Sequence, residues 1–194
     1  MSVLPRKPET PQTKDIIEKS KRVLQLALTQ SGRSNFIRQY LYLLWPEAQG
    51  ILLALARQIG GEIKLPDGKT PLLAVCLRHG AANFYERKRY IRYNPATWDH
   101  NVFVFFFQGL LNQAAEIFDC RVSTAAGSCW EAIKLPYLDW RLHNPGEIEV
   151  YWPAGGKEAS DQAAVQLFRL VLGDHEHRHI WTVNQLINLL GGDS

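Results

Sequence analysis

The sequence lacks any uninterrupted apolar run of about eighteen residues, the least that a helix needs to span a bilayer. The start of the chain, residues 1–13, is polar and contains three prolines, so it does not have the pattern of a secretory signal peptide. The composition, 46% hydrophobic and 21% charged, is sufficient for a packed core and unlike that of a disordered chain. We therefore expect a cytoplasmic protein with no membrane partner.

Cysteine is scarce as well, with three residues in the chain: Cys76, Cys120 and Cys129. None forms a Cys-x-x-Cys pair, which argues against a zinc ribbon, and the odd number favours reduced thiols. The glycine-rich loops that bind nucleotide phosphates, Gly-x-x-x-x-Gly-Lys-Ser/Thr and Gly-x-Gly-x-x-Gly, do not occur. The sequence therefore predicts no cofactor.

Net charge is only +3, but it is unevenly distributed. Residues 1–60 contain nine basic and four acidic residues, for a net +5, whereas residues 61–194 contain thirteen and fifteen, for a net −2. A basic N-terminal third favours an anionic partner for one face of the protein.

Three helices are predicted in the N-terminal third, after a flexible leader over residues 1–12. Apolar residues recur at helical spacing from Lys14 to Gln30, and basic residues occupy the opposite face. Ser34 is a good N-cap for a second helix that extends to about Trp45. Pro46 then opens a third helix, which Gly60 and Gly61 end.

Two β-hairpins are expected further along the chain. The first pairs residues 62–65 with 70–77 around the turn Pro66-Asp67-Gly68. The second pairs residues 138–143 with 147–152 around Asn144-Pro145-Gly146, and a separate strand covers residues 120–125. Three helices and a hairpin also occur in winged helix-turn-helix proteins, but the third helix is too apolar to read DNA.

A long helix over residues 99–119 is apolar on most sides, which predicts that it is buried. Two more helices are expected at the C-terminus, over residues 160–172 and from the capping box at Thr182 to Gly191. The predicted fold is therefore a single α+β domain over residues 13–194. It combines an N-terminal helical layer, a mostly antiparallel sheet with the buried central helix, and two C-terminal helices.

The densest basic segment, residues 84–93, contains four cations among four aromatic residues. Cations bind phosphates and aromatic rings stack on bases, so this mixture suits RNA or single-stranded DNA. The other interpretation is an edge strand whose charges prevent aggregation. Together with the first two helices, the segment defines a candidate nucleic-acid-binding set: Lys14, Lys19, Lys21, Arg22, Arg33, Arg38, Tyr85, Arg87, Lys88, Arg89, Tyr90, Arg92 and Tyr93.

The leading hypothesis is a non-enzymatic, nucleic-acid-associated or assembly protein that uses this basic and aromatic surface. The first alternative is a protein–protein interaction subunit of a larger complex, in which the same surface meets an acidic protein. The second is a small metal-assisted hydrolase, since His175 and His177 in the segment 174–179 have the spacing of metal ligands on a strand.

One short stretch, Gly127–Trp130, is similar to the nucleophile segment of papain-like cysteine proteases. That family has a Cys where this chain has Ala126, and a Gln where it has Ser123. The nucleophile should also begin a long helix, which Pro136 would interrupt. We therefore predict no catalytic residue from this resemblance.

Overall fold

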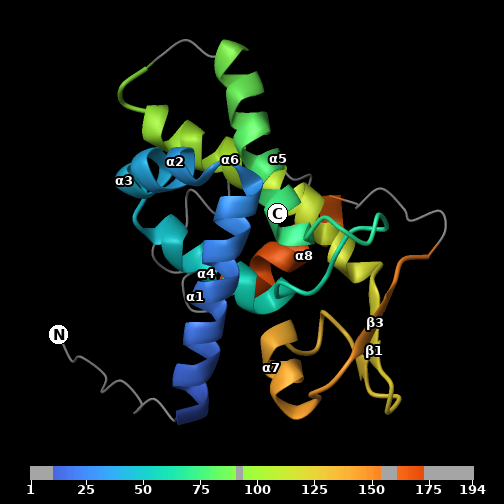
Figure 1. Cartoon of the computed structure of the whole chain (residues 1–194). Helices are drawn as coiled ribbons and strands as arrows, with labels where there is room; N and C mark the ends of the chain where they lie inside the picture. Colours follow the sequence, from blue (N-terminus) through green and yellow to red (C-terminus); the bar gives the residue numbers. More distant parts are fainter. Residues whose placement is uncertain (1–10, 91–93, 154–160, 173–194) are drawn as a thin grey trace.

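The computed structural model describes residues 11–90, 94–153 and 161–172. These residues are mostly helical and include one small three-stranded antiparallel sheet, so the α+β class is confirmed. The helices are stacked around one another, and the sheet lies at the opposite end of the molecule from α2 and α3 (Figure 1). The sheet is much smaller than the one we expected. Among the described residues, no helix is long and apolar enough to cross a membrane.

Helix α1 spans Pro11–Ser31 and confirms the first predicted helix. It begins inside the segment expected as a leader, at a proline, which is favourable in the first turn of a helix. The buried face of α1 includes Leu24, Ala27 and Leu28, and it packs against α4 and α5. Helix α1 therefore places its apolar face against the core, as its amphipathic pattern predicted.

The second predicted helix forms in three short pieces: α2 (Ser34–Phe36), η1 (Ile37–Leu41) and α3 (Tyr42–Leu44). The middle piece is a π-helical turn, in which the backbone N–H of Tyr42 donates to the carbonyl of Ile37. Such a turn holds one more residue than an α-helical turn, and nothing in the sequence pattern predicted it. Helix α4 (Glu47–Ile59) follows Pro46, as expected.

Helix α5 (Leu72–Arg87) replaces the second strand of the first predicted hairpin, so that prediction is wrong. A single bridge between Lys64 and Pro71 is all the β-pairing that the described structure has there. The apolar run 72–77 suggested a strand because the first turns of α5 are buried on all sides and so lack a polar face, whereas Arg78 and His79, which follow, are exposed.

The basic segment 84–93 is also helical where the structure describes it. Its first residues complete α5, and η2 (Lys88–Tyr90) adds a 3₁₀ turn. The edge-strand interpretation is therefore wrong for residues 84–90. Residues 91–93 lie outside the described part of the chain.

The predicted buried helix forms as α6 (Trp98–Ala114), extended by the 3₁₀ turn η3 (Ala115–Phe118). It runs antiparallel to α5 at unusually close range. A Cβ added at Gly109 would lie 2.5 Å from the Cβ of Asn83, and one added at Gly80 would lie 2.8 Å from the carbonyl oxygen of Phe106. Glycine at these two positions therefore allows the two helices to touch.

The sheet has the strand order β2-β1-β3, with β1 at Arg121–Thr124, β2 at Cys129–Trp130 and β3 at Ile148–Tyr151. All pairing is antiparallel, and Val122 faces Trp130 on one side and Val150 on the other. The strands expected at 120–125 and 147–152 thus exist.

The second predicted hairpin is nevertheless wrong, because residues 138–143 belong to helix α7 (Tyr137–His143) and β3 pairs with β1 instead. The helix begins directly after Pro136 and is fixed to α4 by a bidentate ion pair between Arg57 and Asp139, at 2.6 and 2.7 Å. The Trp140 ring lies 5.9 Å from that of Tyr137 between centroids, and the Trp152 indole N–H donates to the Lys64 carbonyl.

Helix α8 (Asp161–Leu172) matches the helix predicted at 160–172 and packs against α4, α6 and η3. Its buried side chains, among them Leu167 and Phe168, are fully enclosed in the core. The last predicted helix, from Thr182 to Gly191, lies outside the described residues.

The contact between α5 and α6 predicts that Gly109→Ala destabilises the protein. Although alanine is the better helix former, its methyl group would overlap the Asn83 side chain and the His79 carbonyl. The free energy of unfolding in urea should fall by about 1–3 kcal/mol. Asn112→Ala, at an exposed site on the same helix, should change it by less than about 0.5 kcal/mol. Equal effects of the two substitutions would contradict the tight packing.

The turn before α5 predicts a pH-dependent contribution to stability from Asp67. Its carboxylate accepts hydrogen bonds from the backbone of Lys69 and from the backbone and hydroxyl of Thr70. These bonds lower the pKa of Asp67 from 3.8 to about 2. The stabilisation is therefore present above pH 3.8 and lost as pH falls through about 2. Asp67→Ala should unfold at lower urea concentration than the parent at pH 6, and the gap should narrow near pH 2. A constant gap would refute the assignment.

Candidate functional site

The helical segment formed by α2, η1 and α3 separates two hollows in the protein surface. Ile37 and Leu41 anchor the segment, because both side chains are fully buried in the core. Residues on one side of the segment line a hollow against α5 and α6, and residues on the other line a hollow against α1 and α4. The π-helical turn lies between the two hollows. Such turns frequently occur at functional sites.

The first hollow, which we name the aromatic pocket, has a volume of about 540 Å³. It is assembled from α2, η1, the end of α5, the following turn and the start of α6. Most of its walls are rings, and the remaining groups are two amides and one ammonium. Its lining residues are Asn35, Phe36, Gln39, Tyr40, Phe84, Tyr85, Lys88 and Trp98.

The rings of the aromatic pocket hold one another in place. Phe36 lies 5.3 Å from both Phe84 and Tyr85 between ring centroids. The indole N–H of Trp98 donates to the Tyr40 hydroxyl at 2.7 Å, which joins α6 to the π-helical turn. These contacts fix the walls before any ligand binds.

Lys88 is the cation of this pocket. Its ammonium lies 4.3 Å from the centroid of the Tyr85 ring and 5.7 Å from that of Phe84. A cation over a ring face is favourable but only weakly so at an exposed site, about 0.5–1 kcal/mol. Lys88 would therefore lose only this small stabilisation if its ammonium turned from the rings to a phosphate.

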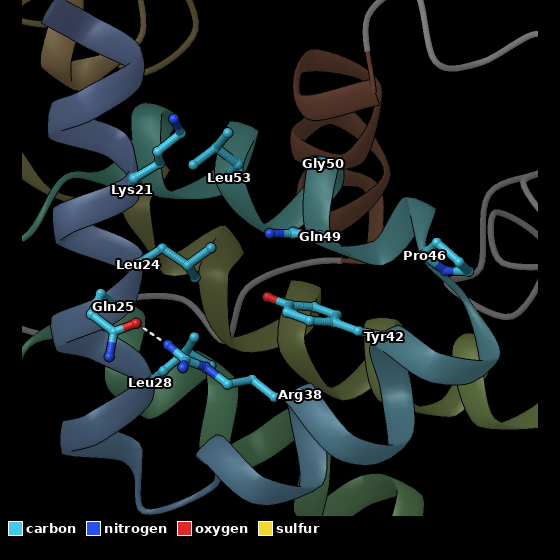
Figure 2. A pocket seen from close by; sticks show the side chains of 10 residues that line it. All are labelled: Lys21, Leu24, Gln25, Leu28, Arg38, Tyr42, Pro46, Gln49, Gly50 and Leu53. Atoms are coloured by element: carbon cyan, nitrogen blue, oxygen red, sulfur yellow. Dashed lines mark hydrogen bonds between the residues drawn. The ribbon is translucent and has the colours of Figure 1, made fainter.

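The second hollow, the α1–α4 groove, has a volume of about 610 Å³ and is shown in Figure 2. It lies between α1, the segment 38–46 and α4. Its residues combine two cations, two glutamines and a tyrosine with an apolar wall: Lys21, Leu24, Gln25, Leu28, Arg38, Tyr42, Pro46, Gln49, Gly50 and Leu53.

Polar groups converge in the middle of the groove. The guanidinium of Arg38 donates to the side-chain oxygen of Gln25, whereas Lys21 at the rim pairs with Glu18 at 2.6 Å. The hydroxyl of Tyr42 points toward α1 (Figure 2) and is buried, with no hydrogen-bond partner among the described residues. Burial raises the pKa of Tyr42 to about 12, against a smaller opposing effect of Arg38. The hydroxyl is therefore protonated at neutral pH and available as a donor.

A third, smaller hollow of about 380 Å³ lies between α5 and α6 and includes His79, Asn83, Glu86 and Glu116. Burial raises the pKa of Glu116 above its ordinary value of 4.5. Within the described residues, no group of three or more His, Cys, Asp or Glu side chains is placed to hold a metal ion. His175 and His177, the metal candidates from the sequence, lie outside the described residues.

The structure divides the predicted basic set into separate groups. Lys14 lies about 25 Å along α1 from the end near the π-helical turn, at 1.5 Å per residue. Lys19 pairs with Asp15 at 2.9 Å, which offsets its charge, and Arg22 is exposed on the same helix. None of these three α1 residues lines the aromatic pocket.

Lys88 lines the aromatic pocket, and Arg33 and Arg89 lie within two residues of lining residues along the chain; all three cations are exposed. Tyr85 lines the pocket, and Tyr90, 84% exposed, follows in η2. Arg87 packs over the Phe105 ring of α6 and donates to Asn83 of α5, so its side chain is engaged by these two helices. Arg38 and Lys21 belong to the α1–α4 groove. Arg92 and Tyr93 lie outside the described residues.

Several lining residues were not predicted from the sequence, among them Phe36, Tyr40, Trp98 and Tyr42. Phe36 and Tyr40 are four residues apart on a predicted helix, so a shared face was foreseeable. Trp98 is 58 residues from Tyr40 along the chain, and no local pattern indicates their contact.

Comparisons with known proteins add no further assignment. No protein-family model matches the chain. Searches of curated proteins and of solved structures likewise find no match.

The unpartnered hydroxyl of Tyr42 predicts that Tyr42→Phe does not destabilise the protein. A buried hydroxyl without a partner costs about 1–3 kcal/mol, and phenylalanine removes it while keeping the ring. The free energy of unfolding in urea should rise by up to about 1 kcal/mol or stay constant. A loss larger than about 1 kcal/mol would show that the hydroxyl makes a stabilising bond in the folded protein.

Proposed function

We propose that the chain is a non-enzymatic protein that binds single-stranded nucleic acid, RNA or DNA, at the aromatic pocket and the cations around it. The observation that carries the proposal is the pocket itself: five aromatic side chains line a hollow of about 540 Å³ that also contains Lys88. This composition combines flat apolar walls for a base with a positive charge for the backbone.

Stacking would supply most of the binding free energy. Stacking of a base on an aromatic side chain contributes about 1–3 kcal/mol and tolerates any base. Tyr85 is the most exposed of the pocket rings, at 37%, and is therefore the one best placed to receive a base from solvent. The amides of Asn35 and Gln39 supply donors and acceptors for base edges, a typical role of these side chains in single-strand recognition.

The sugar–phosphate backbone would be held by Arg33, Lys88 and Arg89. These three side chains are exposed and come from the two segments that meet at the contact between Phe36 and Tyr85. Lysine and arginine gain affinity by releasing counterions from phosphates, so binding should weaken as salt rises. A duplex would bind less well, because its stacked bases are not free to enter the pocket.

The alternative function is a protein–protein interaction subunit. Two exposed leucines favour it: Leu43 on α3 is 77% exposed and Leu26 on α1 is 55% exposed. Exposed apolar side chains of this size mark protein interfaces when they gather into a patch. In that case the cations would contact an acidic partner rather than phosphates.

The proposal predicts that Lys88→Glu/Arg89→Glu weakens binding of a fluorescein-labelled oligouridylate of about twelve nucleotides. Fluorescence anisotropy should show a loss of about tenfold or more at low salt. The slope of log K against log salt should become shallower by about 1.4, the value for two lost phosphate contacts on a single strand. Lys64→Glu/Lys69→Glu, a matched reversal of two exposed cations in another segment, should bind nearly as the parent does.

A second pair of variants separates stacking from charge. Tyr85→Ala should weaken binding about tenfold without changing the salt slope, because it removes a ring and no charge. Tyr151→Ala, which removes an exposed ring from β3, should have no effect. Absence of oligonucleotide binding by the parent, or equal losses in test and control variants, would refute the proposal. Salt-dependent retention of a protein, with no oligonucleotide binding, would support the alternative.

A further inference from the structure

We propose that the α1–α4 groove is a separate binding site for a small monocarboxylate with an apolar body. The proposal goes beyond the nucleic-acid function, because the groove lies on the other side of the segment 34–44 from the aromatic pocket. Three observations support it: the volume and walls of the groove, the donors that converge in it, and its charge.

The walls of the groove suit an apolar body. Leu24 and Leu28 from α1 face Leu53 from α4 across the hollow, and Pro46 closes one end (Figure 2). The volume of about 610 Å³ lies within the range of about 300–1,000 Å³ that is typical of small-molecule sites. A chain or ring of modest size would therefore be enclosed by aliphatic side chains.

The polar groups in the middle of the groove suit a carboxylate. Arg38 presents a planar guanidinium, whose fork of N–H groups matches the two oxygens of a carboxylate. Tyr42 contributes a protonated, buried hydroxyl with no partner among the described residues. The amide of Gln49 points from α4 into the same space (Figure 2). A bound carboxylate would compete with Gln25 for Arg38 and, because the Tyr42 hydroxyl is buried, would reach that hydroxyl only after neighbouring side chains shift.

The charge of the groove selects one negative charge rather than two. The charged side chains that line it are Lys21 and Arg38, and Lys21 is already paired with Glu18. These three groups sum to a single positive charge, so a monoanion would be neutralised, whereas a phosphate dianion would be left with an excess of negative charge. A carboxylate with an apolar tail therefore fits better than a phosphate monoester.

The test uses the full chain and three probes with the same tail: octanoate, octyl phosphate and octanol. Isothermal titration calorimetry should show the tightest binding for octanoate. Arg38→Gln should weaken octanoate binding about tenfold or more and leave octanol binding unchanged, because only the head-group contact is lost. Tyr42→Phe should weaken octanoate binding by a smaller factor, about three- to tenfold, without unfolding the protein.

The matched control is Arg22→Gln, which removes an exposed arginine from α1 outside the groove and should leave octanoate affinity unchanged. Unchanged octanol binding by Arg38→Gln also shows that the groove remains folded. The proposal is overturned if the parent does not bind octanoate, if octanol or octyl phosphate binds as tightly, or if Arg38→Gln and Arg22→Gln behave alike. Oligonucleotide binding is measured separately, so either proposal can fail without the other.

Discussion

The close contact between α5 and α6 is the constraint on which the rest of the structure depends. Gly80 and Gly109 let the two helices approach until backbone and side-chain atoms touch, and the other helices pack around this pair. Because the helices are antiparallel, the end of α5 and the start of α6 lie together, with Phe84 and Trp98 6.1 Å apart between centroids. The walls of the aromatic pocket are thus set by a contact in the core, about one turn from Phe84 along α5 at Gly80 and about three turns from Trp98 along α6 at Gly109.

The sequence predicted the elements whose signals are local. Amphipathic spacing and prolines located α1, the segment 34–44, α4, α6 and α8, although Ser34 is the first residue of α2 rather than its N-cap. Sequence patterns predicted the wrong element or the wrong pairing where the structure depends on a segment distant in the chain. The run that begins α5 was taken as a strand because residues 72–77 are all buried, and helical turns buried on all sides are continuously apolar. Strand β3 was assigned to the nearest preceding segment, whereas it pairs with β1, which is more distant in the chain.

The candidate site was predicted in part, for a similar reason. Composition drew attention to Tyr85, Lys88 and Arg89, and the structure places these residues at or beside the aromatic pocket. The pocket itself requires Phe36 and Tyr40 from one segment and Trp98 from another, which only the tertiary fold brings together. The α1–α4 groove had no sequence signal beyond its two cations, because neither an unpartnered hydroxyl nor an enclosed volume can be recognised from residue types.

The π-helical turn also limits how the chain can vary in length. It holds one residue more than an ordinary turn, and the residues on its two sides belong to different hollows. Deletion of one residue would restore an α-helical turn and rotate everything after it by about 100° around the helix axis. Tyr42 would then leave the groove while Phe36 kept its place in the aromatic pocket. Although it lies at the surface and joins two longer helices, this segment therefore tolerates substitution better than insertion or deletion, unlike an ordinary surface loop.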